Sequence, residues 1–225
     1  MKRGKELAAQ YMPELMLDKK EPFTVGAVGY TVFRETKRSG SFPKRIIKAD
    51  WEKTECVIEY AIWFDYDIQH LYDLEHVWVY VDKNGRITWA EGSFHGKYLN
   101  QVRISDGMPP LGENGRLRVW MQPGKHAVLP EPEWRESCKD LAGADGLAVP
   151  EIFRGWLPAL DKKMQDKVQR YIRERYAFEP SMEFEQACME EAVLMPWENL
   201  RESIPERLAA QLKEIGIQVQ ERANG

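Results

Sequence analysis

Ionisable side chains are concentrated between residues 63 and 76, where one predicted strand ends and the next begins. Asp73 and Glu75 are two positions apart, so their carboxylates share one face at the start of a strand, and His70 lies in the loop just before them. Oxygen ligands with one imidazole suit Mg²⁺, Ca²⁺ or Mn²⁺ better than structural zinc. The segment therefore predicts a divalent-cation site. Its candidate ligands are Asp65 or Asp67 together with His70, Asp73 and Glu75.

Two further histidines, His95 and His126, are candidate catalytic residues that would move protons at this site. Each lies near a glycine at a predicted strand end, where a polar side chain can project into a cleft between loops. His76 follows the cation segment, and the two-residue period of a strand points it away from the predicted ligands. Each residue also has an ordinary alternative, because loop aspartates usually bind their own backbone and strand histidines usually pack.

The elements that would position these residues have a hydrophobic period of two before residue 130, which is typical of strands. The predicted strands are Phe23–Arg34, Glu55–Phe64, Leu74–Val81, Arg86–Ala90 and Arg116–Gln122. The sequence Asp82-Lys83-Asn84-Gly85 predicts a hairpin between the third and fourth of them, whereas residues 92 to 98 are expected to be irregular. Strands at this spacing with turns between them predict a sandwich or a barrel.

After residue 130 the period changes to 3.6, which predicts helices. One amphipathic helix is predicted from Leu160 to Ile172. A last helix is predicted to begin at Ser203, with Glu206 completing a capping box, and to end at Gly216.

These patterns together predict an α+β protein, an antiparallel β-sandwich with a mostly helical C-terminal third. Residues 1–130 are expected to form the β-sandwich domain with the candidate metal site. Residues 131–225 are expected to form a helical C-terminal subdomain packed on the sandwich.

Composition narrows the classes of function. The 225 residues carry a net charge of −4 without a basic stripe, which argues against nucleic-acid binding, and no apolar run approaches the ~20 residues of a membrane helix. No secretory leader is evident, so a cytoplasmic location is expected. Cys56, Cys138 and Cys188 are too few and too widely spaced for a disulfide framework or a zinc knuckle, and are expected to be reduced packing residues.

The segment His70-Leu71-Tyr72-Asp73-Leu74-Glu75 resembles a family motif. It has the His, Asp and Glu spacing of the Gly-His-Arg-His-Asp-Trp-Glu heptapeptide of necrosis-inducing, cytolysin-like proteins and related vacuolar-protein-sorting-associated sequences. Ser93-Phe94-His95-Gly96 is similar to a later Ser-x-His segment, and Gly124-Lys125-His126-Ala127 to a further turn with histidine. Gln10–Leu15, Glu21–Phe23 and Val77–Tyr80 are also similar, so the resemblance covers residues 10 to 130 and leaves the helical tail unassigned.

The heptapeptide is matched at three positions, which are those that the family uses for its metal. Gln69, Leu71, Tyr72 and Leu74 stand where the family has glycine, arginine, histidine and tryptophan. The resemblance implies a two-sheet sandwich with a divalent-cation pocket in an acidic cleft at one end. The membrane damage caused by secreted members is not expected here, because neither a signal peptide nor a disulfide pattern is evident.

Three interpretations follow. The first is a cytoplasmic, metal-binding β-sandwich protein that acts as a metal-assisted hydrolase on an ester or phosphoester, since a cation with open coordination sites activates water. The second is a non-catalytic module in which the metal organises loops that bind a lipid head group or a glycan. The third is a structural or interaction protein whose helical tail binds a partner.

Overall fold

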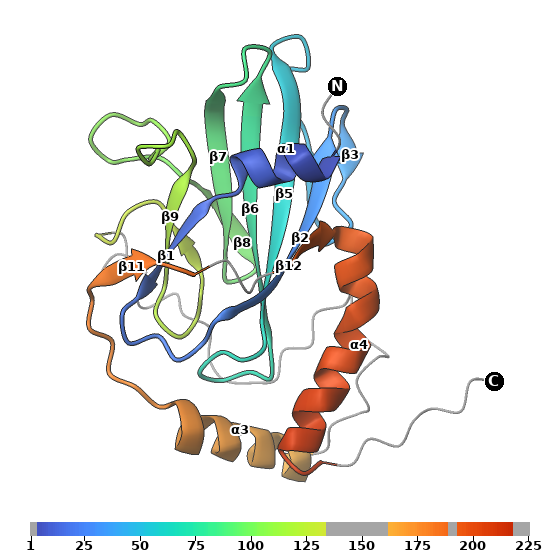
Figure 1. The fold of residues 1–225 in the computed structure, drawn as a ribbon, viewed down its shortest axis with the longest axis vertical. Coiled ribbons are helices and arrows are strands. Elements are labelled where there is room, and N and C mark those ends of the chain that lie inside the picture. Colours follow the sequence, from blue (N-terminus) through green and yellow to red (C-terminus); the bar gives the residue numbers. More distant parts are fainter. Residues whose placement is uncertain (1–3, 134–161, 189–192, 218–225) are drawn as a thin grey trace, which may run out of the picture.

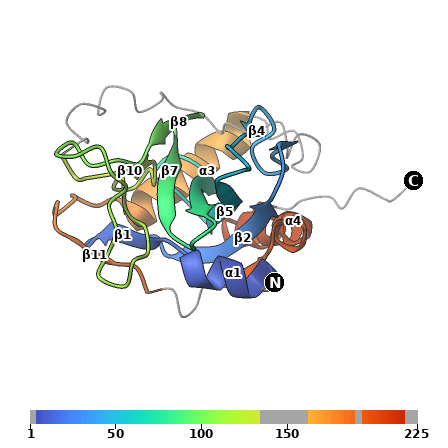
Figure 2. The same ribbon diagram turned by 90° about the horizontal axis from the view of Figure 1, so that it is seen from above.

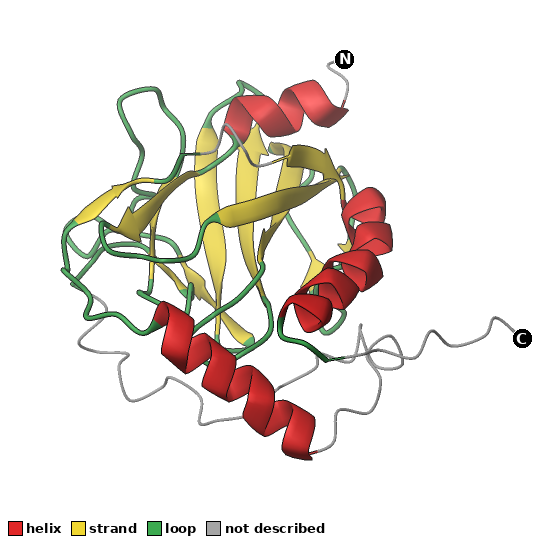
Figure 3. Ribbon diagram, turned by 60° about the horizontal axis from the view of Figure 1, so that its bottom comes forward, coloured by secondary structure: helices red, strands yellow, loops and turns green. Residues whose placement is uncertain are grey.

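The computed structural model describes residues 4–133, 162–188 and 193–217, and in these ranges the protein is mixed α+β with open sheets (Figure 1). Figure 3 shows the helices around the outside of the strands. They are α1 (Gly4–Tyr11), α3 (Lys162–Tyr176) and α4 (Trp197–Glu214). The amphipathic helix predicted over residues 160–172 is therefore present as α3, with Val168 and Ile172 buried, and Leu160 lies outside the described residues.

A six-stranded sheet in the order β12-β2-β5-β6-β7-β8 forms the centre of the fold. Its strands are β2 (Val25–Phe33), β5 (Thr54–Phe64), β6 (Asp73–Asp82), β7 (Ile87–Phe94), β8 (Lys97–Asn100) and β12 (Val193–Pro196). The predicted hairpin is confirmed, since Asp82 N–H donates to Arg86 O at 2.9 Å and Gly85 has a φ of 77°. Such a positive φ suits glycine in a tight turn.

Residues 92 to 98 are not irregular, so that expectation was wrong. Strand β7 extends to Phe94 and pairs with β8, with Ser93 opposite Tyr98 and Phe94 opposite Lys97. The chain reverses at His95 and Gly96, whose φ angles are 45° and 76°. Two successive positive φ angles are typical of a tight hairpin turn, and histidine at the first position hid that signal in the sequence.

A four-stranded sheet in the order β10-β9-β1-β11 lies beside the larger one. It contains β1 (Glu14–Asp18), β9 (Arg118–Met121), β10 (Val128–Leu129) and β11 (Phe184–Gln186), and β3 (Lys37–Arg38) pairs separately with β4 (Ile46–Ile47). Two pairs, β1 with β9 and β12 with β2, are parallel. The two larger sheets are thus not purely antiparallel. The C-terminal third adds one strand to each of them, which the prediction of a mostly helical tail missed.

Helix α4 lies along β2 (Figures 1 and 2) and begins six residues before the predicted cap. Leu200, Ile204 and Leu208 recur every four residues and are at most 2% exposed, so the buried face extends N-terminal to Ser203. The capping-box prediction was therefore wrong. Burial of this face outweighs the cost of Pro205 inside the helix, about 3 kcal/mol in an exposed helix. The predicted end at Gly216, with a φ of 74°, is confirmed.

One large hydrophobic core takes side chains from both main sheets, α1, α3 and α4. Strand β5 is its centre, and the predicted alternation places Ile58, Tyr60 and Ile62 in this core at no more than 1% exposure. The other face of β5 is also buried, because Val57 contributes to a second cluster with Phe33 and Trp78. The central sheet is therefore covered on both faces along β5.

No helix of the described residues is long and apolar enough to cross a membrane. Cys56 has a free, buried thiol, as expected of a packing residue, whereas the free thiol of Cys188 is exposed, so that expectation was wrong for Cys188. Cys138 lies outside the described residues.

Candidate functional site

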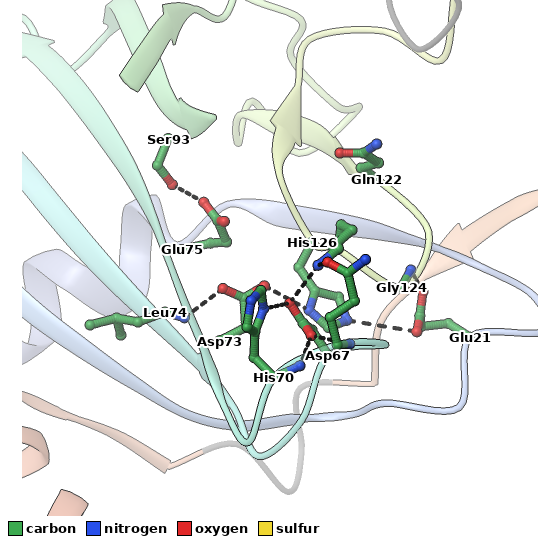
Figure 4. A network of polar contacts seen from close by, with 12 residues as sticks. Glu21, Asp67, His70, Asp73, Leu74, Glu75, Ser93, Gln122, Gly124 and His126 are labelled. Atoms are coloured by element: carbon green, nitrogen blue, oxygen red, sulfur yellow. Dashed lines mark hydrogen bonds and ion pairs between the residues drawn. The ribbon is translucent and has the colours of Figure 1, made fainter. Parts of the chain in front are cut away.

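The loop between β5 and β6 is organised by the carboxylate of Asp67. This carboxylate accepts hydrogen bonds from the backbone N–H groups of Gln69, at 2.5 Å, and His70, and it lies 2.6 Å from Nδ1 of the His70 ring (Figure 4). Burial alone would raise the pKa of Asp67, but His70, Lys125 and the Gln69 N–H group outweigh burial and lower it. Asp67 is thus an ionised residue that fixes both the loop and the His70 ring.

A second loop, between β9 and β10, closes over the first. Gly124 N–H donates to Glu21 Oε2 at 2.7 Å, and Gly124 O accepts from Ile68 N–H at 2.9 Å. A Cβ atom on Gly124 would lie 2.6 Å from Ile68 Cγ2, and the φ of Gly124 is 70°, so only glycine fits. The buried Lys125 ammonium then reaches Asp67 Oδ2 at 3.3 Å and also donates to Gln69.

His126, next in the same loop, is fully buried between two carboxylates. Its Nδ1 lies 3.1 Å from Asp73 Oδ2, and its Nε2 lies 3.6 Å from Glu21 Oε1. Burial alone would lower the pKa of His126, but the hydrogen bond with Asp73 and the negative charges of Asp73 and Glu21 raise it to about 9. At neutral pH His126 is therefore an imidazolium that binds the start of β6 to the Glu21 segment.

Glu75, two residues along β6, has no such cation beside it among residues 4–133, 162–188 and 193–217. Its carboxylate accepts a hydrogen bond from the Ser93 hydroxyl of β7, and the residue is 8% exposed (Figure 4). Burial first, and then the charges of Asp73 and Asp67, raise the pKa of Glu75 well above its usual value. The three carboxylates of this segment therefore lie near enough to repel one another.

His95 approaches the same group from the β7–β8 turn. Its Nε2 lies 3.0 Å from Gln122 Oε1, and burial lowers its pKa despite that contact. The negative charges of Asp73 and Asp67 also act on His95. Because its pKa is lowered, His95 is neutral at pH 7. The residue is only partly buried, so it is in contact with solvent.

The structure brings together six of the seven predicted site residues, and Asp65 is the exception. The six are Asp67, His70, Asp73, Glu75, His95 and His126. The Asp65 carboxylate accepts from Trp63 Nε1 at 2.7 Å and lies 4.0 Å from Arg207 of α4. Asp67 is therefore the aspartate that lies next to His70.

His76 points away from the group, as the strand period requires. It is 2% exposed and its ring stacks on Trp78 with centroids 5.5 Å apart. Burial lowers its pKa to about 3.

Sequence reasoning missed Glu21, Ser93, Gln122 and Lys125 as members of the group. Ser93 and Lys125 are adjacent or near to His95 and His126 in segments that the sequence analysis compared with a known family, and that comparison is the one signal that pointed to them. Glu21 begins Glu21–Phe23, another of the segments compared with the family, whereas Gln122 is brought in by loop packing over a long sequence separation, which a single sequence does not reveal.

The group combines four carboxylates, one lysine and three histidines at one end of the central strands. His70 and Asp73 keep side-chain exposures of 24% and 17%, so solvent reaches them. Within the described ranges, no group of three or more His, Cys, Asp or Glu side chains is placed so that it could hold a metal ion. Carboxylates and an imidazole are donor types that divalent cations take in proteins. Among the described residues, Glu75 has a hydrogen bond from Ser93 but no cationic partner. In comparisons with known proteins, no family model, curated protein or solved structure matches the chain.

Proposed function

We propose that this end of the protein binds a divalent cation, Mg²⁺, Ca²⁺ or Mn²⁺, and that the protein is a metal-assisted hydrolase of an ester or phosphoester. The ligands in this proposal are His70, Asp73 and Glu75, the three residues that match the family heptapeptide. The six-stranded and four-stranded sheets would then form the sandwich that carries the site at one end.

The contact between Asp67 and His70 is the observation that supports this proposal best. Metal-binding histidines commonly donate one ring N–H to a carboxylate, which fixes the tautomer and frees the other nitrogen for the metal. With Nδ1 of His70 at 2.6 Å from Asp67, the Nε2 atom is the one left for a ligand. Asp67 is thus a positioning residue, and its contacts with Gln69 and Lys125 hold it in place.

A divalent cation bound at such a site would polarise a substrate oxygen and would lower the pKa of a bound water molecule. The protein supplies His95 as the base. Because Gln122 Oε1 accepts from Nε2–H of His95, the lone pair on Nδ1 is left to take a proton. The lowered pKa of His95, caused by burial, keeps the ring unprotonated and ready at neutral pH.

His126 has a different part in this proposal. Its ring is inaccessible to solvent and is held between Asp73 and Glu21, so it cannot exchange protons with a substrate. It instead orients Asp73 towards the cation and balances the charges of Asp73 and Glu21.

The test is turnover of p-nitrophenyl acetate and bis-p-nitrophenyl phosphate after removal of metals with EDTA and readdition of each cation. Turnover should require a cation, and His95→Asn should reduce it by about 10² to 10⁴-fold, as expected for loss of a general base. Asp65→Asn is the matched control and should keep full activity. Cation binding without any turnover would reject the hydrolase and leave the binding module.

A further inference from the structure

A second polar group surrounds the guanidinium of Arg45. It lies on the face of the six-stranded sheet that carries Trp78 and Tyr80, opposite the large core. The Cζ atom of Arg45 lies 3.7 Å from the ring centroid of Trp78 and 4.0 Å from that of Tyr98. The two rings meet at an interplanar angle of 66°, so they form two walls of a cage. Arg45 is only 4% exposed, whereas Tyr98 is 47% exposed. The cage therefore opens to solvent along its Tyr98 wall.

Two acceptors form the floor of the cage. Nη2 of Arg45 forms an ion pair with Glu91 and donates to the Tyr80 hydroxyl at 3.2 Å. The same hydroxyl donates to Glu91 at 2.7 Å, which aims the carboxylate at the cation. Aromatic walls with a carboxylate floor are a recurring arrangement for binding organic cations.

A second carboxylate lies on the other side of Trp78. Glu59, Trp78 and Glu91 are directly opposite one another on β5, β6 and β7. Glu59 accepts from Trp78 Nε1 and from the Ser41 hydroxyl, both at 2.7 Å. The tryptophan wall is thereby fixed in orientation.

Arg45 fits this cage incompletely. Within the part of the chain that the structure describes, its buried Nε and Nη1 atoms have no hydrogen-bond acceptor. Buried donors without acceptors are costly, so this occupant is held less firmly than a fully paired one.

The segment that carries Arg45 is a short cap. Residues 39 to 45 close on themselves, with Ser39 N–H donating to Arg45 O at 3.0 Å, and the β3–β4 pair at its base contains two residues on each strand. A cavity of about 390 Å³, lined by Phe33, Gly40 and Trp197 among others, lies against this cap. The cap is therefore bordered by open space on its Gly40 side.

We propose that the cage of Trp78, Tyr80, Glu91 and Tyr98 is a binding site for a guanidinium group, which Arg45 occupies until an external guanidinium replaces it. The floor favours guanidinium over a quaternary ammonium, because Glu91 and Tyr80 accept N–H hydrogen bonds that a quaternary ammonium lacks. The source is either free arginine or an arginine side chain on a protein partner. This site is separate from the proposed cation site and does not depend on it.

The test uses N-acetyl-arginine amide as the probe and N-acetyl-lysine amide as the matched control of equal charge. Binding is followed by the NMR signal of Trp78 Nε1–H. The wild-type protein should show saturable shifts with the arginine probe, and binding at least tenfold weaker with the lysine probe. Tyr98→Ala, at an exposed position, should weaken arginine binding at least tenfold.

Arg45→Ala empties the cage and should bind the arginine probe at least tenfold more tightly than the wild type, whereas Arg45→Ala with Glu91→Gln should not. No saturable shift in the wild type would overturn the proposal even if Arg45→Ala binds, because Arg45 would then be a permanent structural residue. Equal binding of both probes would also overturn it. Free arginine and a short arginine-containing peptide, compared in the same titration, distinguish the two sources.

Discussion

The imidazole ring of His126 lies flat on the phenyl ring of Phe64, with ring centroids 3.7 Å apart and planes 3° from parallel. Phe64 ends β5, and His126 belongs to the loop between β9 and β10, so the contact joins two segments that are distant in sequence. The same imidazolium faces Asp73 and Glu21 at its two nitrogens. One ring thus provides apolar packing and the counter-charge for one buried carboxylate, Glu21, and one partly buried carboxylate, Asp73.

We expect His126→Asn to destabilise the protein by about 3 to 5 kcal/mol, because removal of one partner leaves buried charges uncompensated. Asparagine tolerates the φ of 52° at this position, so backbone strain is not the cause. Urea unfolding at pH 7 measures the effect. His95→Asn is the matched control, since His95 also has a positive φ but is partly exposed, and it should cost less than about 1 kcal/mol. Equal losses in both variants would contradict the role given to His126.

Asp18 should make stability depend on pH in the acid range. Burial alone would raise its pKa, but hydrogen bonds from Lys20 N–H, from the N–H and hydroxyl of Ser181 and from Met182 N–H lower it below the usual value. A lowered folded-state pKa stabilises the protein above the unfolded pKa of about 3.9, and this contribution is lost as the pH falls through the folded value. Asp18→Asn should therefore lose about 1.5 to 3 kcal/mol at pH 7 and progressively less below pH 4.

Unfolding by urea at pH 7, 5 and 3 tests the Asp18 prediction. Glu185→Gln, on the exposed side of the paired strand β11, is the control and should leave the unfolding midpoint unchanged. A deficit of Asp18→Asn that stays constant down to pH 3 would show that its charge is not the stabilising feature.

Ser203 lies inside α4 and not at its start. Its hydroxyl donates to Leu200 O at 2.8 Å, a bond within the helix. Because alanine is the better helix former, Ser203→Ala should change stability by no more than about 0.5 kcal/mol. Leu200→Ala, at a fully buried position one turn earlier, should cost about 2 to 5 kcal/mol. Thermal unfolding of both variants measures this, and a larger loss in Ser203→Ala would restore the capping role.

The sequence predicts the central strands well because their pattern is local. The strand β5 and the turn at Asp82–Gly85 depend on residues within a few positions of each other, and both are confirmed, although burial does not alternate along β5. The pairing of β11 with β1 and of β12 with β2 depends on contacts across more than 150 residues, which no local period encodes. The start of α4 was misplaced because Ser203 and Glu206 imitate a cap within a longer amphipathic face.

The candidate site was predictable to a similar degree. Asp73 and Glu75 follow from strand period, and His70 from its place before the strand. The choice between Asp65 and Asp67 required the structure, because the distinction depends on the contact of Asp65 with Trp63 and Arg207.

The central claim, a divalent cation held by His70, Asp73 and Glu75, is tested most directly by calorimetric titration of EDTA-treated protein with Mn²⁺, Mg²⁺ and Ca²⁺. We expect one site per chain for at least one cation, and stabilisation against unfolding by about 2.7 kcal/mol at a hundredfold excess over Kd. Binding should be lost in Asp73→Asn and Glu75→Gln and kept in Asp65→Asn, in which the carboxylate next to Arg207 is removed. No binding by the parent protein, or equal binding by all three variants, would contradict the claim.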